Sequence, residues 1–438
     1  MSLFGRGNNK KDAPSESVGA TSDLEEPEDV AVPVTSRRGR VFASFQYRDY
    51  RYLWVSQFGW SGAMWMEQVA RNWLVWQLTG SSLSVGLILL FQGIPRLFLA
   101  LPGGVVADRF NQKYVMMASQ SLTMAGYIIS FLLVWTGSVE VWHLYVLSLA
   151  RGVSMSFTQP ARQTLISRLV PSDRMLNAFA LNQIANNSNR LLAPAVAGLL
   201  IGFYDVTAAF GTAVIIFSIT IVSTAMVRSS SAKSMNARQS AKGQLIEGIN
   251  YVLNHRGILL LMSVAFAMFT FVLPYNALMP MIADQVLGIG PAGFGVLLSL
   301  GGVGALAGGL ILASVGDVQS KGLLFLGGSF AFAISIFLLG IAPWASLAFV
   351  IMPFIGASQS IFFTAGNTAL LSQAPPELRG RVLSVYNLDR GLQPAGSGLA
   401  GGMADLLSAP TTLMIMGGIG AVLVLGISIF APTLRKLR

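Results

Sequence analysis

Cysteine is absent from this chain, histidine occurs only twice, and the 19 acidic residues are outnumbered by 29 lysines and arginines. The lack of cysteine excludes disulfides and thiolate metal sites, and two histidines argue against a histidine-based metal centre. We therefore expect neither a metal nor a cofactor. Only 11% of the residues are charged and 53% are hydrophobic. This balance is typical of a multi-pass membrane protein.

Polar sequence is concentrated at the start of the chain, and residues 1–44 contain no apolar run of the kind found in a signal peptide. We expect this segment to be a disordered cytoplasmic tail. Its basic end, which includes Arg37, Arg38 and Arg40, adjoins the first apolar segment. A positive flank of this kind marks the cytoplasmic side of a membrane span.

Apolar runs then recur along the rest of the chain, and a helix needs about 20 such residues to cross a bilayer. The pattern predicts twelve spans, an even number that places both termini on one side. The predicted spans are 52–78, 83–106, 114–135, 142–165, 176–202, 207–227, 258–283, 292–315, 322–342, 345–371, 382–406 and 411–432.

The basic residues sort to one side of these spans. The alternate connections, such as "TGSSL", "TGSVEV" and "APWA", contain no lysine or arginine. Basic residues gather in the connections on the cytoplasmic side of membrane proteins, so both termini are predicted to be cytoplasmic. Topology thus explains the positive net charge, and we expect the lipid bilayer rather than nucleic acid as a partner.

The longest internal connection, 228–257, divides the chain in the middle. It starts as a polar linker and ends with helical spacing of Leu245, Ile249 and Val252, which predicts an amphipathic helix on the cytoplasmic face. The chain is therefore predicted to form two six-helix bundles, 45–227 and 258–438.

Two weak internal sequence similarities relate the predicted halves. Pro171 and Pro375 stand in similar turns between spans, and Asp108 and Asp317 follow the second and eighth spans at nearly the same offset. These similarities indicate that one half arose by duplication of the other. They predict a substrate site between the halves near the middle of the bilayer.

The stretch "GVVADRFNQK" contains Gly104, Asp108, Arg109 and Lys113. Its pattern is a glycine, three further residues, an Asp-Arg pair and a later basic residue. Together with "PARQTLISRLVP", "RLLAPAVAGLLIG" and "PPELRGRVLSVYNL", it resembles the major facilitator superfamily, in the bacterial branch of the enterobactin exporter and drug-efflux proteins. The resemblance implies an all-α fold of twelve transmembrane helices in the inner membrane. It also implies a monomer that exports small organic molecules in exchange for protons by alternating access.

In such a fold, Asp108 is expected beside the N-terminus of the eleventh span, whose positive dipole end attracts an anion. Arg379 and Arg381 stand just before that terminus and strengthen the attraction. This contact would latch the halves while the transporter is open to the outside. The alternative role is a positively charged anchor with a helix cap. The second copy of the motif, at Asp317, has Val318 where the first has arginine.

Ionisable residues inside spans usually face a cavity or a partner, because a charge at the bilayer centre costs about 2.5 to 3.5 kcal/mol. The third, sixth, ninth and twelfth spans contain none, and the resemblance implies that these four face lipid. The first, second, fourth, fifth and eleventh spans hold the candidates for proton coupling and cavity charge, which are Glu67, Arg71, Arg96, Arg151, Arg190, Asp389 and Arg390.

Glu67 is the central candidate because it can pair with Arg71 on its own helix, or across the bundle with Arg151 or Arg190. An acid that exchanges between such partners changes its proton affinity between states, as proton coupling requires. Two other roles for Glu67 stay open, a static counter-ion and a direct contact with substrate.

The excess of intramembrane arginine over acid predicts an anionic or catecholate-like cargo. Further candidates for contact with a small-molecule substrate lie on spans that the fold directs inward, although core packing is the alternative role of each phenylalanine. These candidates are Asn182, Asn186, Phe269, Tyr275, Asn276, Gln359, Phe363 and Asn367.

The chain lacks the G-x-x-x-x-G-K-[ST] phosphate loop of ATP-driven transporters. It also lacks the clustered acids, or His and Ser clusters, of an intramembrane enzyme, so no enzymatic activity is expected. A proton-coupled exporter is the leading prediction. The alternatives are an importer or lipid mover on the same fold, and a membrane scaffold or sensor that does not transport.

Overall fold

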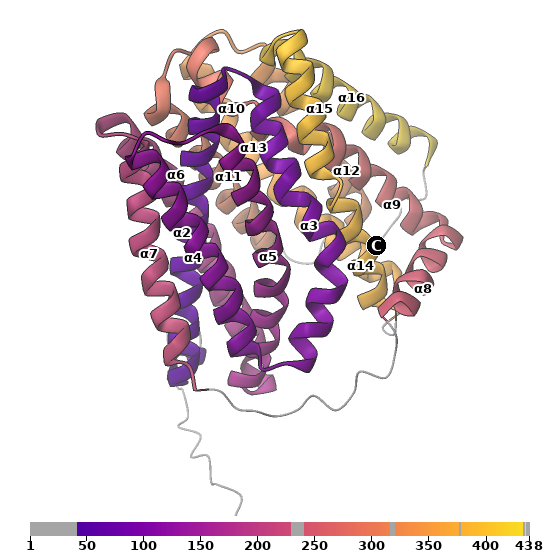
Figure 1. The fold of residues 1–438 in the computed structure, drawn as a ribbon. Helices are drawn as coiled ribbons and strands as arrows, with labels where there is room; N and C mark the ends of the chain where they lie inside the picture. The colour runs from indigo at the N-terminus through magenta and orange to yellow at the C-terminus, as the bar shows by residue number, and fades with distance from the viewer. Residues whose placement is uncertain (1–41, 229–240, 316–319, 376–377, 432–433, 435–438) are drawn as a thin grey trace, which may run out of the picture. The chain divides into compact units, whose positions relative to one another are not determined.

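The computed structural model describes residues 42–228, 241–315, 320–375, 378–431 and 434, and every regular element in these ranges is helical. The tail expected at 1–44 falls almost wholly outside them and stays a prediction. In the first half, a short 3₁₀ turn (Ala43–Gln46) precedes six helices, drawn from indigo to magenta in Figure 1. They are α2 (Arg48–Thr79), α3 (Ser82–Arg109), α4 (Gln112–Trp135), α5 (Val141–Leu169), α6 (Met175–Phe203) and α7 (Val206–Met226).

The second half begins with a helix inside the 228–257 connection, where the sequence predicts one. The elements of this half, from pink to yellow in Figure 1, are α8 (Ala241–Asn254), α9 (Arg256–Ala267), α10 (Met279–Met281), α11 (Gly290–Val315), α12 (Lys321–Gly340), α13 (Ala345–Gln373), α14 (Arg379–Arg390), α15 (Gln393–Leu406) and α16 (Ala409–Phe430).

Local chemistry sets several helix ends. α2 ends at Gly80, whose φ of 58° lies in the left-handed region that glycine adopts without strain. The side chain of Ser81 then caps α3 by accepting a hydrogen bond from the backbone N–H of Ser84 at 3.2 Å. Asp205 caps α7 in the same way through the N–H of Ala208 at 2.9 Å.

Two predicted spans are broken rather than continuous. The span expected at 258–283 runs through α9, a π turn (Met268–Val272), a 3₁₀ turn (Leu273–Ala277), α10 and a second π turn (Ile282–Val286). Pro274 and Pro280 cause this because proline has no N–H and clashes with the preceding turn. The span expected at 382–406 divides between α14 and α15, just before Pro394.

Eight segments of the described helices are long and apolar enough to cross a bilayer. The count of twelve spans stays a prediction, because α2, α5 and α6 are too polar for this criterion and α14 and α15 are too short. The segments that qualify are Ser82–Leu99, Gln112–Trp135, Val206–Met226, Arg256–Ala277, Gly290–Ser314, Lys321–Gly340, Ala345–Gln373 and Ala409–Phe430.

The halves meet closely through two helix pairs, α3 with α15 and α6 with α11. Glycine permits this approach, since a Cβ atom on Gly86 would lie 2.3 Å from the carbonyl oxygen of Ser397. A Cβ atom on Gly295 would lie at the same distance from the carbonyl oxygen of Pro194. Small residues at helix interfaces allow such contacts between backbones.

These close contacts lie toward one end of the helices, at which α2 ends and α3 begins. We call it the far end, and it is the upper end in Figure 1. The near end is the opposite one, where α2 begins and α3 and α5 end. α8 packs there against α14, and an ion pair joins Glu247 of α8 to Arg381 of α14.

Candidate functional site

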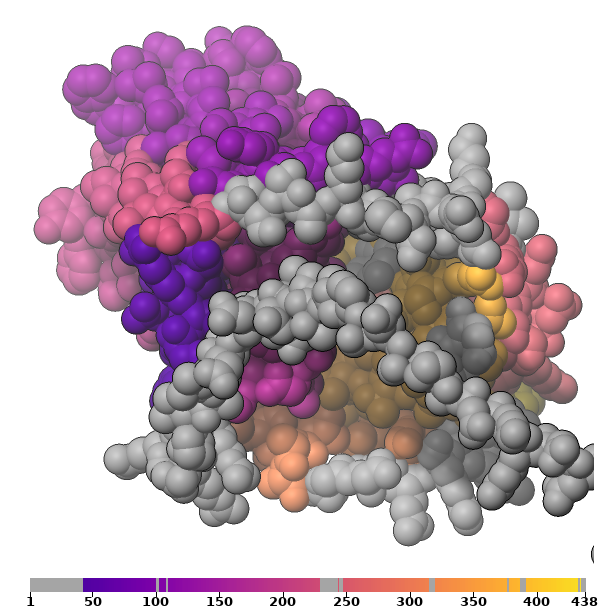
Figure 2. Space-filling view, turned by 90° about the horizontal axis from the view of Figure 1, so that it is seen from below, coloured from indigo at the N-terminus to yellow at the C-terminus, as the bar shows by residue number. Residues whose placement is uncertain are grey.

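A cavity of about 680 Å³ lies between the two halves. Its walls come from α2, α3, α5 and α6 of the first half, and from the Leu273–Ala277 turn, α11, α13 and α15 of the second. Figure 2 looks at the molecule from the near end and shows it hollowed between the helices of the two halves. The site therefore opens toward the near end, while the halves touch at the far end.

The cavity wall is polar, and its charge is positive. Among the lining residues that the structure describes there is no aspartate or glutamate. Amide side chains dominate, as eight glutamines and three asparagines, joined by three arginines. The arginines are Arg96, Arg162 and Arg190; the amides are Gln57, Gln68, Gln92, Gln159, Gln163, Gln183, Gln359, Gln393, Asn182, Asn186 and Asn276.

Most of the side chains predicted to contact substrate do line this cavity. They are Asn182, Asn186, Tyr275, Asn276, Gln359 and Phe363. Phe269 lies outside the lining, in an aromatic core where its ring centroid is 5.7 Å from that of Phe362. Asn367 is exposed and is also outside the lining.

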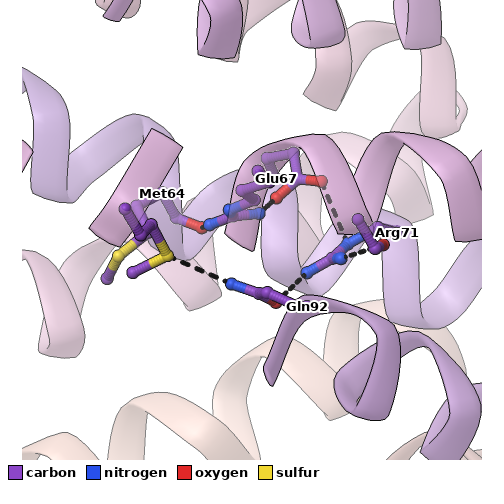
Figure 3. A network of polar contacts seen from close by, with 7 residues as sticks. Met64, Glu67, Arg71 and Gln92 are labelled. Atoms are coloured by element: carbon purple, nitrogen blue, oxygen red, sulfur yellow. Dashed lines mark hydrogen bonds and ion pairs between the residues drawn. The ribbon is translucent and has the colours of Figure 1, made fainter. Parts of the chain in front are cut away.

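Glu67 is buried between two arginines inside the first half (Figure 3). Its carboxylate lies 3.0 Å from Nε of Arg71, one turn along α2, and forms a second ion pair with Arg151 of α5. Arg151 also donates to the backbone oxygen of Met64 at 3.1 Å. The acid is thus paired within its own helix and across to a neighbouring helix at once.

Polar contacts connect this charged cluster to the cavity wall. Arg71 donates to the hydroxyl of Ser148 and, at 3.1 Å, to the side-chain oxygen of Gln92, which in turn contacts the sulfur of Met155. Gln92 and Met155 line the cavity, whereas Glu67, Arg71 and Arg151 do not. Gln92 therefore links Arg71, to which it is hydrogen-bonded in Figure 3, to the cavity wall.

Arg190 is not a partner of Glu67, because it faces the cavity on α6. It donates instead to the side-chain oxygen of Gln359, which belongs to the other half. Its guanidinium also lies 5.9 Å from the ring centroid of Trp65. Arg96 lines the same cavity from α3 and is exposed.

Arg162 is a site residue that is missing from the candidates predicted from the sequence, although it falls near the end of the predicted span 142–165. It lies within α5, is 3% exposed and lines the cavity. It donates to the side-chain oxygen of Gln57, and its guanidinium lies 5.0 Å from the ring centroid of Trp60. The spacing from Arg151, three helical turns on the same face, was the signal available in the sequence.

At the far end, two acidic residues of the second half accept hydrogen bonds from the first half. The carboxylate of Asp405 accepts hydrogen bonds from the Ser81 hydroxyl at 2.5 Å and from the backbone N–H groups of Ser82 at 2.7 Å and Leu83 at 3.2 Å. Asp284 accepts a bond from the indole of Trp76 at 2.9 Å. A carboxylate at a helix N-terminus is favourable because the dipole end is positive. We call these contacts the far-end latch.

Only part of the predicted loop motif can be placed. The side chains of Asp108, Asp389 and Arg390, and the whole of Asp317, lie outside the described part of the chain. The contact of Asp108 with the start of α14 therefore stays a prediction.

The other members of the motif lie at the near end. Gly104 is in α3 and Arg109 is exposed at its end, while Lys113 donates to the backbone oxygen of Ala225 at 2.7 Å. Arg379 donates to the backbone oxygen of Ala374 at 3.3 Å. Arg381 forms its ion pair with α8, so the linker helix holds one of the arginines expected to attract Asp108.

Residues 39–437 match the family described as "Transmembrane secretion effector". The chain is similar to macrolide efflux protein A of Streptococcus pyogenes, with 24% identity over 85% of this chain and 92% of that protein. It is also similar to the enterobactin exporter EntS of Shigella flexneri, with 23% identity over 79% of this chain and 82% of that protein. A crystal structure of the peptide transporter POT shares the fold, with a TM-score of 0.73, 15% identity and coverage of 89% of this chain and 95% of that chain.

Proposed function

Because the chain belongs to the transmembrane secretion effector family of the major facilitator superfamily, we propose that it exports a small anionic or amphipathic organic molecule in exchange for protons. Membership makes it a multi-pass membrane transporter of the efflux type rather than an enzyme. The exchange of protons, the class of cargo and the route through the protein are the proposed parts.

For the topology, we propose twelve spans in two bundles, 45–227 and 258–438, with the near end at the cytoplasm of a bacterial inner membrane. The tail 1–44 and the linker 228–257 then lie on the cytoplasmic side. The distribution of basic residues supports this orientation, since the connections assigned to the far end have no lysine or arginine.

The observation that carries the proposal is the cavity between the halves. It is open at the near end, closed at the far end, and lined by amides and arginines with no acid among its described lining residues. An anionic group would find donors on several sides there, while the apolar rings of Trp60 and Phe363 suit an amphipathic molecule. Export would require the near end to close and the far-end latch to break.

For coupling, we propose Glu67 as the proton carrier. It is the one acid among the buried side chains that the structure describes, and it forms ion pairs with both arginines beside it. A proton on Glu67 would remove its ion pair with Arg151, which joins α2 to α5, and its ion pair with Arg71 within α2. Rearrangement of Arg71 would then reach the cavity wall through Gln92.

Transport in proteoliposomes with an imposed proton gradient tests this proposal, with erythromycin and enterobactin as probes. Glu67→Gln keeps the size of the side chain but cannot lose a proton, so we expect gradient-driven accumulation to fall at least tenfold. Exchange of labelled for unlabelled probe without a gradient should persist.

The matched control is Glu140→Gln, which changes an exposed acid at the far end and should transport like the wild type. Wild-type accumulation by Glu67→Gln would falsify the coupling role. Accumulation only when the gradient is reversed would identify an importer.

A further inference from the structure

We propose that Arg162 forms a carboxylate-binding subsite in the near-end part of the cavity, where the Nε and Nη2 edge of its guanidinium receives a planar oxyanion of the cargo. The inference rests on the proposed function, because it is the cargo that would bring the carboxylate into the cavity. It adds a specific residue and a specific chemical group to the general preference for anions.

The hydrogen bonds of Arg162 leave one edge of the guanidinium unused. Nη1 donates to Gln57, whereas Nε and Nη2 are buried and have no hydrogen-bond partner among the described residues. These two nitrogens lie on the same edge of the group, and their N–H bonds point in parallel. This fork matches the two oxygens of a carboxylate.

The charge of Arg162 also lacks a counter-ion within the described residues, although the side chain is only 3% exposed. Glu67 is paired with Arg71 and Arg151, and three turns of α5, about 16 Å, separate Arg151 from Arg162. Arginine does not give up its proton in proteins, so its burial leaves an uncompensated charge. A bound anion would supply the missing charge.

We assign two further side chains of the cavity wall to the proposed subsite. Trp60 lies against the guanidinium, with 5.0 Å from its ring centroid to the carbon of the group, and fixes its plane. Asn182 of α6 lines the same cavity, is 7% exposed, and has no described hydrogen-bond partner for its side-chain oxygen or nitrogen. Its amide can donate to a bound carboxylate while its oxygen accepts from a hydroxyl.

The two free nitrogens of Arg162 are covered in this state, so a carboxylate reaches them only when neighbouring side chains turn aside. Because Trp60 packs on the guanidinium, binding should change the environment of its ring. The fluorescence of Trp60 therefore reports on the subsite, and loss of the signal in Trp60→Phe distinguishes it from the other seven tryptophans, which include Trp65 in the same cavity.

The test is an equilibrium titration of the full chain in lipid nanodiscs, without a gradient, followed by tryptophan fluorescence. The probes are benzoate and benzamide, which share a shape and differ in charge. We expect saturable binding of benzoate by the wild type, and at least tenfold weaker binding of benzamide. Arg162→Gln should weaken benzoate at least tenfold.

The matched control is Arg168→Gln on the same helix, outside the cavity lining, which should bind benzoate like the wild type. Arg162→Lys keeps the charge but loses the fork, so binding three- to tenfold weaker than wild type is expected. If Arg162→Gln does not fold, Arg162→Lys and Asn182→Leu carry the test. Equal binding of benzoate and benzamide, or wild-type affinity in Arg162→Lys, overturns the subsite.

The two proposals fail separately. Gradient-driven export of erythromycin without benzoate binding would disprove the carboxylate subsite and would leave the proposed transport mechanism standing. The opposite outcome is benzoate binding that depends on Arg162 in a protein that transports neither erythromycin nor enterobactin in response to the proton gradient. It would support the subsite and disprove proton-coupled export of these probes.

Discussion

The two halves of the bundle differ in what they bury. Among its described side chains, the first half buries four charged ones, Glu67, Arg71, Arg151 and Arg162. The buried polar side chains described in the second half are all neutral. In their place, the second half has an aromatic cluster beside the cavity, which consists of Phe269, Phe325, Phe362, Phe363 and Tyr386.

This difference indicates that the two halves are suited to different roles. Charged groups exchange partners when a proton binds, so the first half is suited to coupling and to recognition of an anion. Aromatic side chains provide large, rigid apolar surfaces, so the second half is suited to the shape and apolar part of the cargo. The second half also contains the broken helix at Pro274, and Tyr275 and Asn276 line the cavity from that break.

The largest effect should come from removing one charge of the first half. Arg151→Met leaves Glu67 with Arg71 as its remaining ion-pair partner, and breaking a buried pair costs about 3–5 kcal/mol. The free energy of unfolding in mixed detergent micelles measures this loss. Adding Glu67→Gln to Arg151→Met should lower the free energy of unfolding further, because the buried Arg71 then has no acid beside it.

Arg168→Met serves as the control for this first change, since Arg168 lies on the same helix and outside the lining of the cavity. It should cost less than about 1 kcal/mol, as most surface changes do. A loss of that small size in Arg151→Met would contradict the contrast between the halves.

The second half also has functional acids, but they lie in the far-end latch. Asp405→Ala removes an acceptor of three hydrogen bonds, so the far end should open more often. The chain has no cysteine, so a single Ser82→Cys, at a position that is buried against Met281 of the second half and lies outside the cavity lining, reports this opening through maleimide labelling. We expect labelling about tenfold faster, which corresponds to about 1.4 kcal/mol and suits lost bonds to a charged group.

Asp173→Ala in the Ser82→Cys background is the matched control for the latch. This acid lies outside the latch, between α5 and α6, and its side chain is 69% exposed. Its removal should leave the labelling rate unchanged. Equal labelling in Asp405→Ala and Asp173→Ala would show that Asp405 does not hold the far end closed.

The smallest effect is expected in the aromatic half. Phe363→Leu keeps an apolar side chain on the cavity wall but removes the flat ring. The erythromycin concentration for half-maximal transport should rise two- to fivefold, which is about 1 kcal/mol or less, with unchanged dependence on the proton gradient. Phe354→Leu, on the same helix but 64% exposed, is the control. A changed proton dependence in Phe363→Leu would assign coupling to the second half as well.

Much of the fold could be predicted because apolar run length and turn chemistry act locally. The ranges of α4, α7, α12 and α16 follow from hydropathy alone. The pairing of Glu67 with Arg71 follows from their spacing of one helical turn. Among the helices of more than 18 residues, hydropathy is weakest in α2, α5 and α6, and these three helices form much of the cavity wall. Low hydropathy is thus itself a signal of the site.

The sequence by itself determined that the chain has long apolar helices, basic residues on one side of them, and a few charges inside them. Only the tertiary structure decided that Glu67 pairs with Arg151 rather than Arg190, that Arg162 faces the cavity, and that Asp405 closes the far end. The physical reason is that hydropathy and periodicity fix a helix and its faces. The partner of each face depends on how helices far apart in the sequence rotate and pack against one another.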